Sequence, residues 1–167
     1  MLDFSILKRQ NPLFKLINFE VMSDVFSKDK RSEVMSKIRS KNTKPEIIVR
    51  KFLFAKGFRF RIHDKKLPGK PDIVLKKFAI VIFINGCFWH GHINNNCRNA
   101  KLPKSNAFFW KNKIIGNMQK DERNINLLKE LRWNVITIWE CQLKGKFLND
   151  TLESLLTSIL GNISNTH

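Results

Sequence analysis

Three cysteines and one histidine have the side-chain chemistry of a zinc site. Cys87, His92 and Cys97 are close together in the sequence, and Cys141 follows much later in the chain. Three thiolates and one imidazole form a closed tetrahedral set that favours Zn²⁺, whereas thiolates are poor ligands for Mg²⁺ or Ca²⁺. We therefore predict a structural zinc site. His90 is so near His92 in sequence that spacing alone does not decide which of the two is the ligand.

A second set of residues has the chemistry of phosphodiester hydrolysis. Asp72 follows a turn that contains Gly69 and Pro71, and it begins a short apolar segment. Many restriction-enzyme-like nucleases carry their metal-binding aspartate at such a position. Mg²⁺ held there would polarise the phosphate and stabilise the departing alkoxide. Glu46 is the candidate second carboxylate, which would contact either the metal-binding aspartate or the water bound to the metal. The alternative for Asp72 is a turn-capping residue.

A general base is missing from the usual nuclease position. That position would hold an acidic residue and a lysine on the next strand, but residues 83–85 are Phe-Ile-Asn and carry no charge. His90 is the candidate base, because a neutral imidazole accepts a proton from water near pH 7. It lies in the cysteine-containing loop, which we expect the strand hairpin to hold over Asp72. The alternatives are a zinc ligand or a surface histidine.

The positioning elements are predicted from hydrophobic periodicity and from turn signals. Helices are expected over 30–39, from Thr43 to Gly57, over 108–131 and over 150–160, and strands over 58–62, 72–75, 79–84 and 133–139. This order predicts an α/β layer arrangement. The long loop over 85–107 is unusual for a compact domain unless a metal organises it. We interpret 1–21 as an N-terminal extension or a mis-assigned start, 22–162 as one domain, and 163–167 as a tail.

The charge balance points to a polyanionic partner. Lysine and arginine total 31 against 14 acidic residues, which gives a formal net charge of +17. The surplus is spread along the chain, and this favours a basic face on a folded domain. The alternative is a lysine bias imposed by an AT-rich genome. Three cysteines, no apolar stretch of about 18 residues and no signal-peptide layout predict a cytoplasmic protein that binds no membrane.

Six stretches together resemble the very short patch repair (Vsr) DNA endonucleases over about residues 24–146. They are Arg31-Ser32 with Met35, Thr43-Lys44-Pro45-Glu46, Leu67-Pro68-Gly69-Lys70-Pro71-Asp72, Gly86-Cys87-Phe88-Trp89-His90-Gly91-His92, Phe109-Trp110 with Lys113-Ile114, and Trp139-Glu140-Cys141. The resemblance implies a restriction-endonuclease-like fold, with a central mixed β-sheet flanked by helices. It also implies a Mg²⁺-dependent nick 5′ of the thymine in T:G mismatches, which arise from 5-methylcytosine deamination.

The expected partner is therefore double-stranded DNA with a T:G mismatch, bound by a monomer in the bacterial cytoplasm, at the nucleoid. Mismatch-repair proteins are further expected partners. Two other interpretations stay open. One is a related nuclease of a restriction–modification system with another specificity. The other is a zinc-stabilised DNA-binding module with an impaired active site.

The resemblance also assigns roles to single residues. It implies that Asp72 and the Ile84 carbonyl bind Mg²⁺, that His90 is the general base, that Glu46 contacts the water around the metal, and that Asn85 contacts the phosphate. It implies that zinc is bound by Cys87, His92, Cys97 and Cys141. It assigns DNA intercalation to Phe88, Trp89, Trp110 and Met35. By pattern alone, Trp110 and Met35 also fit an ordinary helix core.

Three departures from the family pattern accompany these assignments. Ile84 stands where some members have threonine, but a backbone carbonyl survives any substitution. Asn85 replaces a histidine, so it donates a hydrogen bond without carrying charge. The separation of His92 from Cys97 is longer than in some relatives, which predicts a wider loop.

Overall fold

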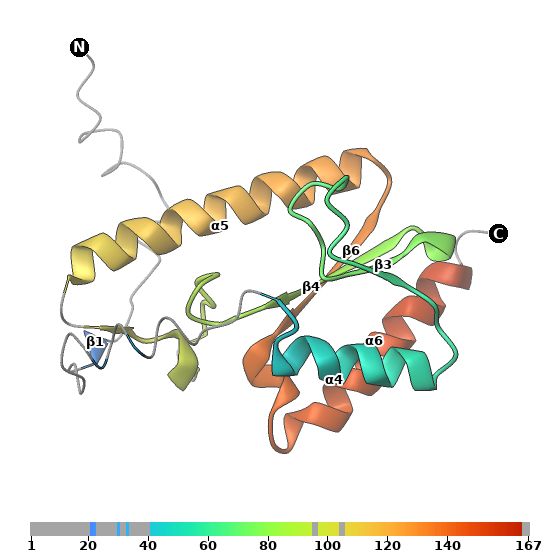
Figure 1. The fold of residues 1–167 in the computed structure, drawn as a ribbon, viewed down its shortest axis with the longest axis horizontal. Helices are drawn as coiled ribbons and strands as arrows, with labels where there is room; N and C mark the ends of the chain where they lie inside the picture. The colour runs from blue at the N-terminus through green and yellow to red at the C-terminus, as the bar shows by residue number, and fades with distance from the viewer. Residues whose placement is uncertain are drawn as a thin grey trace, which may run out of the picture.

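A four-stranded mixed sheet forms the centre of the molecule (Figure 1). The computed structural model describes residues 21–22, 30, 33, 41–94, 97–103 and 106–164. The strands are β2 (Arg61–Ile62), β3 (Ile73–Leu75), β4 (Ile80–Asn85) and β6 (Asn134–Trp139), in the order β2-β3-β4-β6. The β2–β3 and β3–β4 pairs are antiparallel, and β4–β6 is parallel. The predicted α/β class with a mixed central sheet is confirmed.

Strand β4 is a central strand of the sheet and is largely buried. Ile80 and Ile82 point into one core, and Val81 points into another on the opposite face. This alternation places apolar side chains on both faces of the sheet, as expected for a central strand covered by helices on both sides.

Three helices cover the two faces of the sheet. Helices α4 (Lys44–Ala55) and α6 (Phe147–Ser164) lie together on one face, and the long helix α5 (Ala107–Glu130) runs along the other (Figure 1). Val49, Leu53, Leu155 and Ile159 fill the core under α4 and α6. Leu128 anchors α5 to the sheet. Among the described residues, no helix is both long and apolar enough to cross a membrane.

The start and the end of α4 follow the sequence signals. Thr43 is the N-cap and forms a capping box with Glu46, and a proline occupies the first turn. These contacts satisfy backbone N–H groups that the first turn leaves without helical partners. The chain leaves the helix through Gly57, whose φ of 86° lies in the left-handed region that glycine adopts readily. The predicted helix is confirmed.

Some predicted boundaries differ from the structure. Only Arg61–Ile62 of the predicted strand over 58–62 pairs in the sheet, because Phe58 turns inward against Phe78 with ring centroids 5.8 Å apart. A 3₁₀ helix, η1 (Lys76–Phe78), connects β3 to β4, and β4 covers 80–85 where a strand over 79–84 was predicted. The last helix is longer than predicted and spans 147–164.

The long loop after β4 contains short elements. The 3₁₀ helix η2 (Arg98–Ala100) is followed by β5 (Leu102–Pro103), which pairs in parallel with β1 (Val21–Met22). The rest of the proposed N-terminal extension lies outside the described residues. The same holds for the predicted helix over 30–39, apart from Lys30 and Glu33, which are helical.

Leu128→Ala should show how strongly α5 depends on its contact with the sheet. Leu128 is 0% exposed, so truncation leaves a cavity and should lower the free energy of unfolding by about 2–5 kcal/mol. Leu127→Ala is the matched control, since Leu127 is 41% exposed. Urea unfolding followed by circular dichroism measures both. Equal losses in the two variants would contradict this packing.

Candidate active site and metal cluster

Asp72 lies at the start of β3, where the backbone of β4 holds its carboxylate. The Ile84 N–H donates to Asp72 Oδ2 over 2.7 Å, so the Ile84 backbone lies beside this carboxylate. Burial raises the pKa of Asp72 and Glu46 adds repulsion, while the Ile84 hydrogen bond and the electrostatic effects of the neighbouring His63 and Arg50 side chains oppose the rise. A buried carboxylate with a raised pKa gains from a nearby cation, so Asp72 fits a divalent metal.

Glu46 is buried and its carboxylate is fully engaged. Oε1 accepts from the Thr43 N–H and hydroxyl, and Oε2 accepts from the Asn42 N–H and from Arg50 Nη2. The residue is only 3% exposed, and its negative charge is compensated by the arginine. The structure therefore places Glu46 next to the Asp72 site, but with its oxygens already occupied by protein donors.

His63 belongs to the same group, although sequence reasoning did not single it out. Its Nε2 lies 3.3 Å from Glu46 Oε2, and its Nδ1 lies 3.7 Å from Asp72 Oδ1. Potential ligand atoms of Glu46, His63 and Asp72 all lie within 4.8 Å of one another. The sequence signal was weak: a histidine directly after the short strand that pairs with β3.

His90 is oriented by a carboxylate on helix α5. Its Nδ1 lies 2.6 Å from Asp121 Oδ2 on α5. A carboxylate partner on Nδ1 favours a hydrogen on that nitrogen and leaves Nε2 free to accept a proton. Sequence reasoning missed Asp121, because only the packing of α5 onto the loop brings it to His90.

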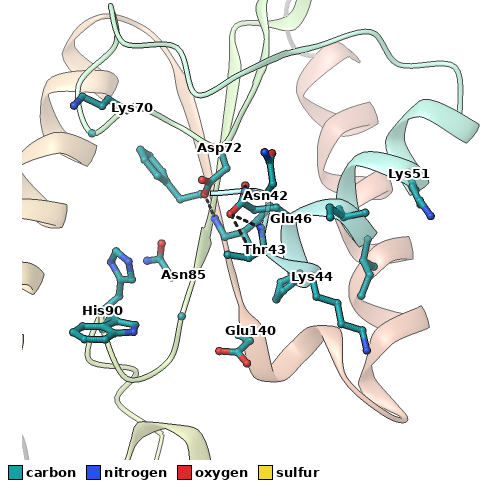
Figure 2. Close-up of a pocket in the computed structure, with 18 residues that line it drawn as sticks. Asn42, Thr43, Lys44, Glu46, Lys51, Lys70, Asp72, Asn85, His90 and Glu140 are labelled. Atoms are coloured by element: carbon teal, nitrogen blue, oxygen red, sulfur yellow. Dashed lines mark hydrogen bonds between the residues drawn. The ribbon is translucent and has the colours of Figure 1, made fainter. Parts of the chain in front are cut away.

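Asp72 and His90 line the same cavity, which has a volume of about 1170 Å³. Figure 2 shows Asp72 and Glu46 at its centre, His90 and Asn85 to one side, and Glu140 below them. Lys44, Lys51 and Lys70 also line it. Cationic side chains around a carboxylate and an imidazole provide positive charge for a phosphate backbone.

The four predicted zinc ligands are brought together in space. Ligand atoms of Cys87, His92, Cys97 and Cys141 lie within 4.8 Å of one another, and Cys141 Sγ is 3.5 Å from His92 Nδ1. The parallel pairing of β4 with β6 explains this, because Asn85 is opposite Trp139 and both strands end at the cluster. His90 points to Asp121 instead, so geometry favours His92 as the histidine of the cluster.

The surroundings of the cluster suit a cation. Burial raises the pKa of the Cys87 and Cys141 thiols, and burial lowers the pKa of His92, which favours its neutral, metal-binding form. The His92 ring stacks on Trp139 at a centroid distance of 4.3 Å. Three neighbouring thiols and a neutral imidazole are the donors that Zn²⁺ prefers, so the residues present fit that ion.

The predicted wedge residues form one aromatic cluster. The Phe88 ring lies 5.1 Å from Trp89 and 5.3 Å from Trp110, and the two tryptophans are 6.0 Å apart. Among the described residues, the buried core clusters do not include Trp110, so it is not an ordinary core residue of α5. Met35 lies outside the described residues.

Helix α5 supports the loop that carries Phe88 and Trp89. Asn117 Nδ2 donates to the Trp89 carbonyl over 2.9 Å. Gly91 has a φ of 61°, and a Cβ there would lie 2.5 Å from Met118 Sδ. The loop therefore approaches α5 too closely for a side chain at Gly91 without rearrangement.

Comparison with known proteins identifies the family. A sequence model described as DNA mismatch endonuclease Vsr matches residues 23–96. The type II nicking enzyme V.NmeAIP of Neisseria meningitidis is 53% identical over 75% of this chain and 87% of its own length. The chain belongs to the Vsr family. The predicted family resemblance is thereby confirmed.

Two further relatives show the breadth of the family. The DNA mismatch endonuclease Vsr of Escherichia coli is 41% identical over 75% of this chain and 78% of its own length. The type II nicking enzyme V.XorIIP of Xanthomonas oryzae pv. oryzae is 43% identical over 83% of the chain and 98% of that protein. Membership supports a DNA mismatch endonuclease or a related nicking enzyme, that is, a DNA-cleaving hydrolase.

His92→Asn and His90→Asn should separate the two neighbouring histidines. We expect the purified protein to contain about one Zn²⁺, as a Cys₃His site does. His92→Asn should lose most of it, because one of the four donors is weakened, whereas His90→Asn should keep it. Elemental analysis by mass spectrometry measures the metal-to-protein ratio. Loss of zinc from His90→Asn alone would refute the assignment of His92.

Proposed function

We propose that this protein nicks one DNA strand 5′ of the thymine in T:G mismatches that arise from 5-methylcytosine deamination, and so starts very short patch repair. The observation that carries the proposal is the convergence of Asp72 and His90 on one cavity whose rim also carries lysines, with His90 oriented by Asp121. Family membership supports DNA cleavage, and this geometry supplies the groups that hydrolysis requires.

Each catalytic side chain has a separate task. Asp72, with the Ile84 carbonyl, would hold Mg²⁺, which supplies charge neutralisation at the scissile phosphate. His90 Nε2 accepts the proton of the attacking water, and Asp121 stabilises the imidazolium that results. The amide of Asn85 donates a hydrogen bond toward the phosphate. The neighbouring lysines bind the flanking phosphates.

The aromatic cluster supplies a means of finding the mismatch. Phe88, Trp89 and Trp110 form a contiguous set of rings beside the proposed catalytic loop. Insertion between base pairs costs a few kcal/mol of unstacking, and less at a mismatch, while stacking on the rings offsets the loss. We assign these residues to intercalation, with Met35 entering from the other groove.

The cysteine cluster is proposed to hold Zn²⁺ as a structural ion. Phe88, Trp89 and His90 all lie between Cys87 and His92 in the chain. Zn²⁺ at this cluster would therefore restrain both the wedge and the base. We further propose that the protein acts as a monomer on nucleoid DNA in the bacterial cytoplasm, alongside mismatch-repair proteins.

A second specificity is the alternative supported by the relatives. V.NmeAIP and V.XorIIP are both called type II nicking enzymes. These names support, as the alternative, a related nuclease of a restriction–modification system with another specificity. The proximity of Asp72 and His90 in one cavity, with Asp121 against His90, supports an enzyme over a binding-only module.

A duplex with a single T:G mismatch should be nicked in the presence of Mg²⁺, and the matched T:A duplex should not. Denaturing electrophoresis of end-labelled strands gives both the rate and the position of the nick. Asp72→Ala should abolish nicking but retain binding in a mobility-shift assay, because the metal ligand is lost and the wedge is not. Equal cutting of both duplexes would refute mismatch specificity, and binding without cutting by the unaltered protein would favour the binding module.

Asp121→Asn should lower the nicking rate about 100- to 10 000-fold, the usual contribution of a general base held in its working orientation. The asparagine keeps the shape of the side chain but not the charge that stabilises the imidazolium. Glu122→Gln is the matched control, since Glu122 is the exposed neighbour on the same helix. Single-turnover rates at saturating protein measure the effect. A rate unchanged by Asp121→Asn would contradict the His90–Asp121 pair.

A further inference from the structure

A half-buried Arg50–His63 pair lies beside Asp72, and the proposed mechanism does not use it. The side chains of Arg50 and His63 are 13% and 17% exposed. They come from α4 and from the loop after β2, two elements that meet only through tertiary packing. Burial of a permanently charged guanidinium is costly unless it is paired, so the contacts of Arg50 indicate what the pair does.

Arg50 determines the orientation of the His63 ring. Its Nη2 contacts Glu46 Oε2 and lies 2.9 Å from His63 Nε2, while Nη1 donates to Asn42 Oδ1 over 2.7 Å. A guanidinium has donors but no acceptor, so we assign His63 Nε2 as the acceptor of this contact. The hydrogen of the neutral ring is then on Nδ1, which faces Asp72 Oδ1 at 3.7 Å.

The backbone of His63 is held in an unfavourable conformation. Its φ is 49°, in the left-handed region that non-glycine residues seldom adopt. Such conformations persist where the surrounding structure imposes them, and they concentrate at functional sites. Here the imposed conformation brings the ring between Glu46 and Asp72.

Glu46 itself is poorly placed to be a direct metal ligand. Its oxygens already accept from Asn42, Thr43 and Arg50. Glu46 contacts Arg50, and Arg50 in turn contacts the ring of His63. The chain of contacts thus runs from the N-terminus of α4 to the metal-binding carboxylate.

We propose that His63 is a positioning residue that holds Asp72 for a divalent metal, an inference that rests on the proposed function for the role of Asp72. The Ile84 N–H donates to Oδ2, and His63 Nδ1 lies 3.7 Å from Oδ1, so a donor stands beside each oxygen of the carboxylate although only the first is within hydrogen-bond distance. Each carboxylate oxygen has two lone pairs and can accept a hydrogen bond while it binds a cation. Contacts as long as 3.7 Å commonly tighten when a site is loaded.

Two substitutions of His63 separate this role from mere packing. The amide nitrogen of His63→Asn can take the place of Nδ1, and asparagine tolerates a positive φ. The amide of His63→Gln reaches toward Nε2 instead, so it retains a partner for Arg50 but loses the donor to Asp72. The probe is Mn²⁺ without DNA, with the free ion measured by electron paramagnetic resonance. Thermal unfolding checks that both variants fold.

We expect His63→Gln to weaken Mn²⁺ binding about 10- to 100-fold, the usual effect of removing a residue that orients a metal ligand. His63→Asn should recover most of this loss. In the nicking assay, His63→Gln should need more Mg²⁺ for half-maximal rate, and high Mg²⁺ should restore most of that rate. Binding to mismatched DNA without metal should be the same in all three proteins.

The outcomes distinguish this inference from the proposed function. Equal Mn²⁺ affinity in His63→Gln and the unaltered protein would overturn the positioning role, even if T:G duplexes are nicked. Equal weakening by His63→Asn and His63→Gln would also overturn it, since the Nδ1 donor would then be irrelevant. His63-dependent Mn²⁺ binding without nicking of any duplex would support the positioning role and refute the proposed nuclease activity.

Discussion

The parallel pairing of β4 with β6 is the constraint on which the rest of the site depends. Parallel strands require a long crossover, and here that crossover includes the cysteine-containing loop and α5. The pairing also makes both strands end at the same edge, with Asn85 opposite Trp139. Cys87 and Cys141 each lie two residues after those ends. Two segments far apart in sequence are thereby brought within reach of one ion.

The site is divided between the central sheet, which carries Asp72, and a long loop, which carries His90. Asp72 is on the sheet side, where the β3–β4 hairpin and the Ile84 N–H hold it. His90 is on the loop, which would be poorly restrained by its own backbone. Asp121 and the close approach of Gly91 to α5 restrain it, together with the cysteine cluster. A reaction that needs a base and a metal ligand at defined separation requires both sides to be held.

Buried charge around Asp72 is balanced rather than avoided. Glu46 and Asp72 would repel one another in a region of low solvent exposure, and this repulsion contributes to the raised pKa of Asp72. Arg50 offsets the charge of Glu46 directly, and His63 separates the two carboxylates. Asp72 lines the cavity, and its neighbours offset its charge only in part, because burial still raises its pKa. This is the charge that a divalent cation would neutralise.

The sequence by itself determined the helix that begins at Thr43, the central apolar strand, the family and the three cysteines of the cysteine cluster, because these depend on local spacing and residue type. It left the choice between His90 and His92 open, and it missed Asp121, Arg50 and His63. Those residues have no local signature, since each acts through a partner on another element. Only tertiary packing, through β4–β6 pairing and the packing of α4 and α5, decided that His90 contacts Asp121 and that His63 lies beside Asp72.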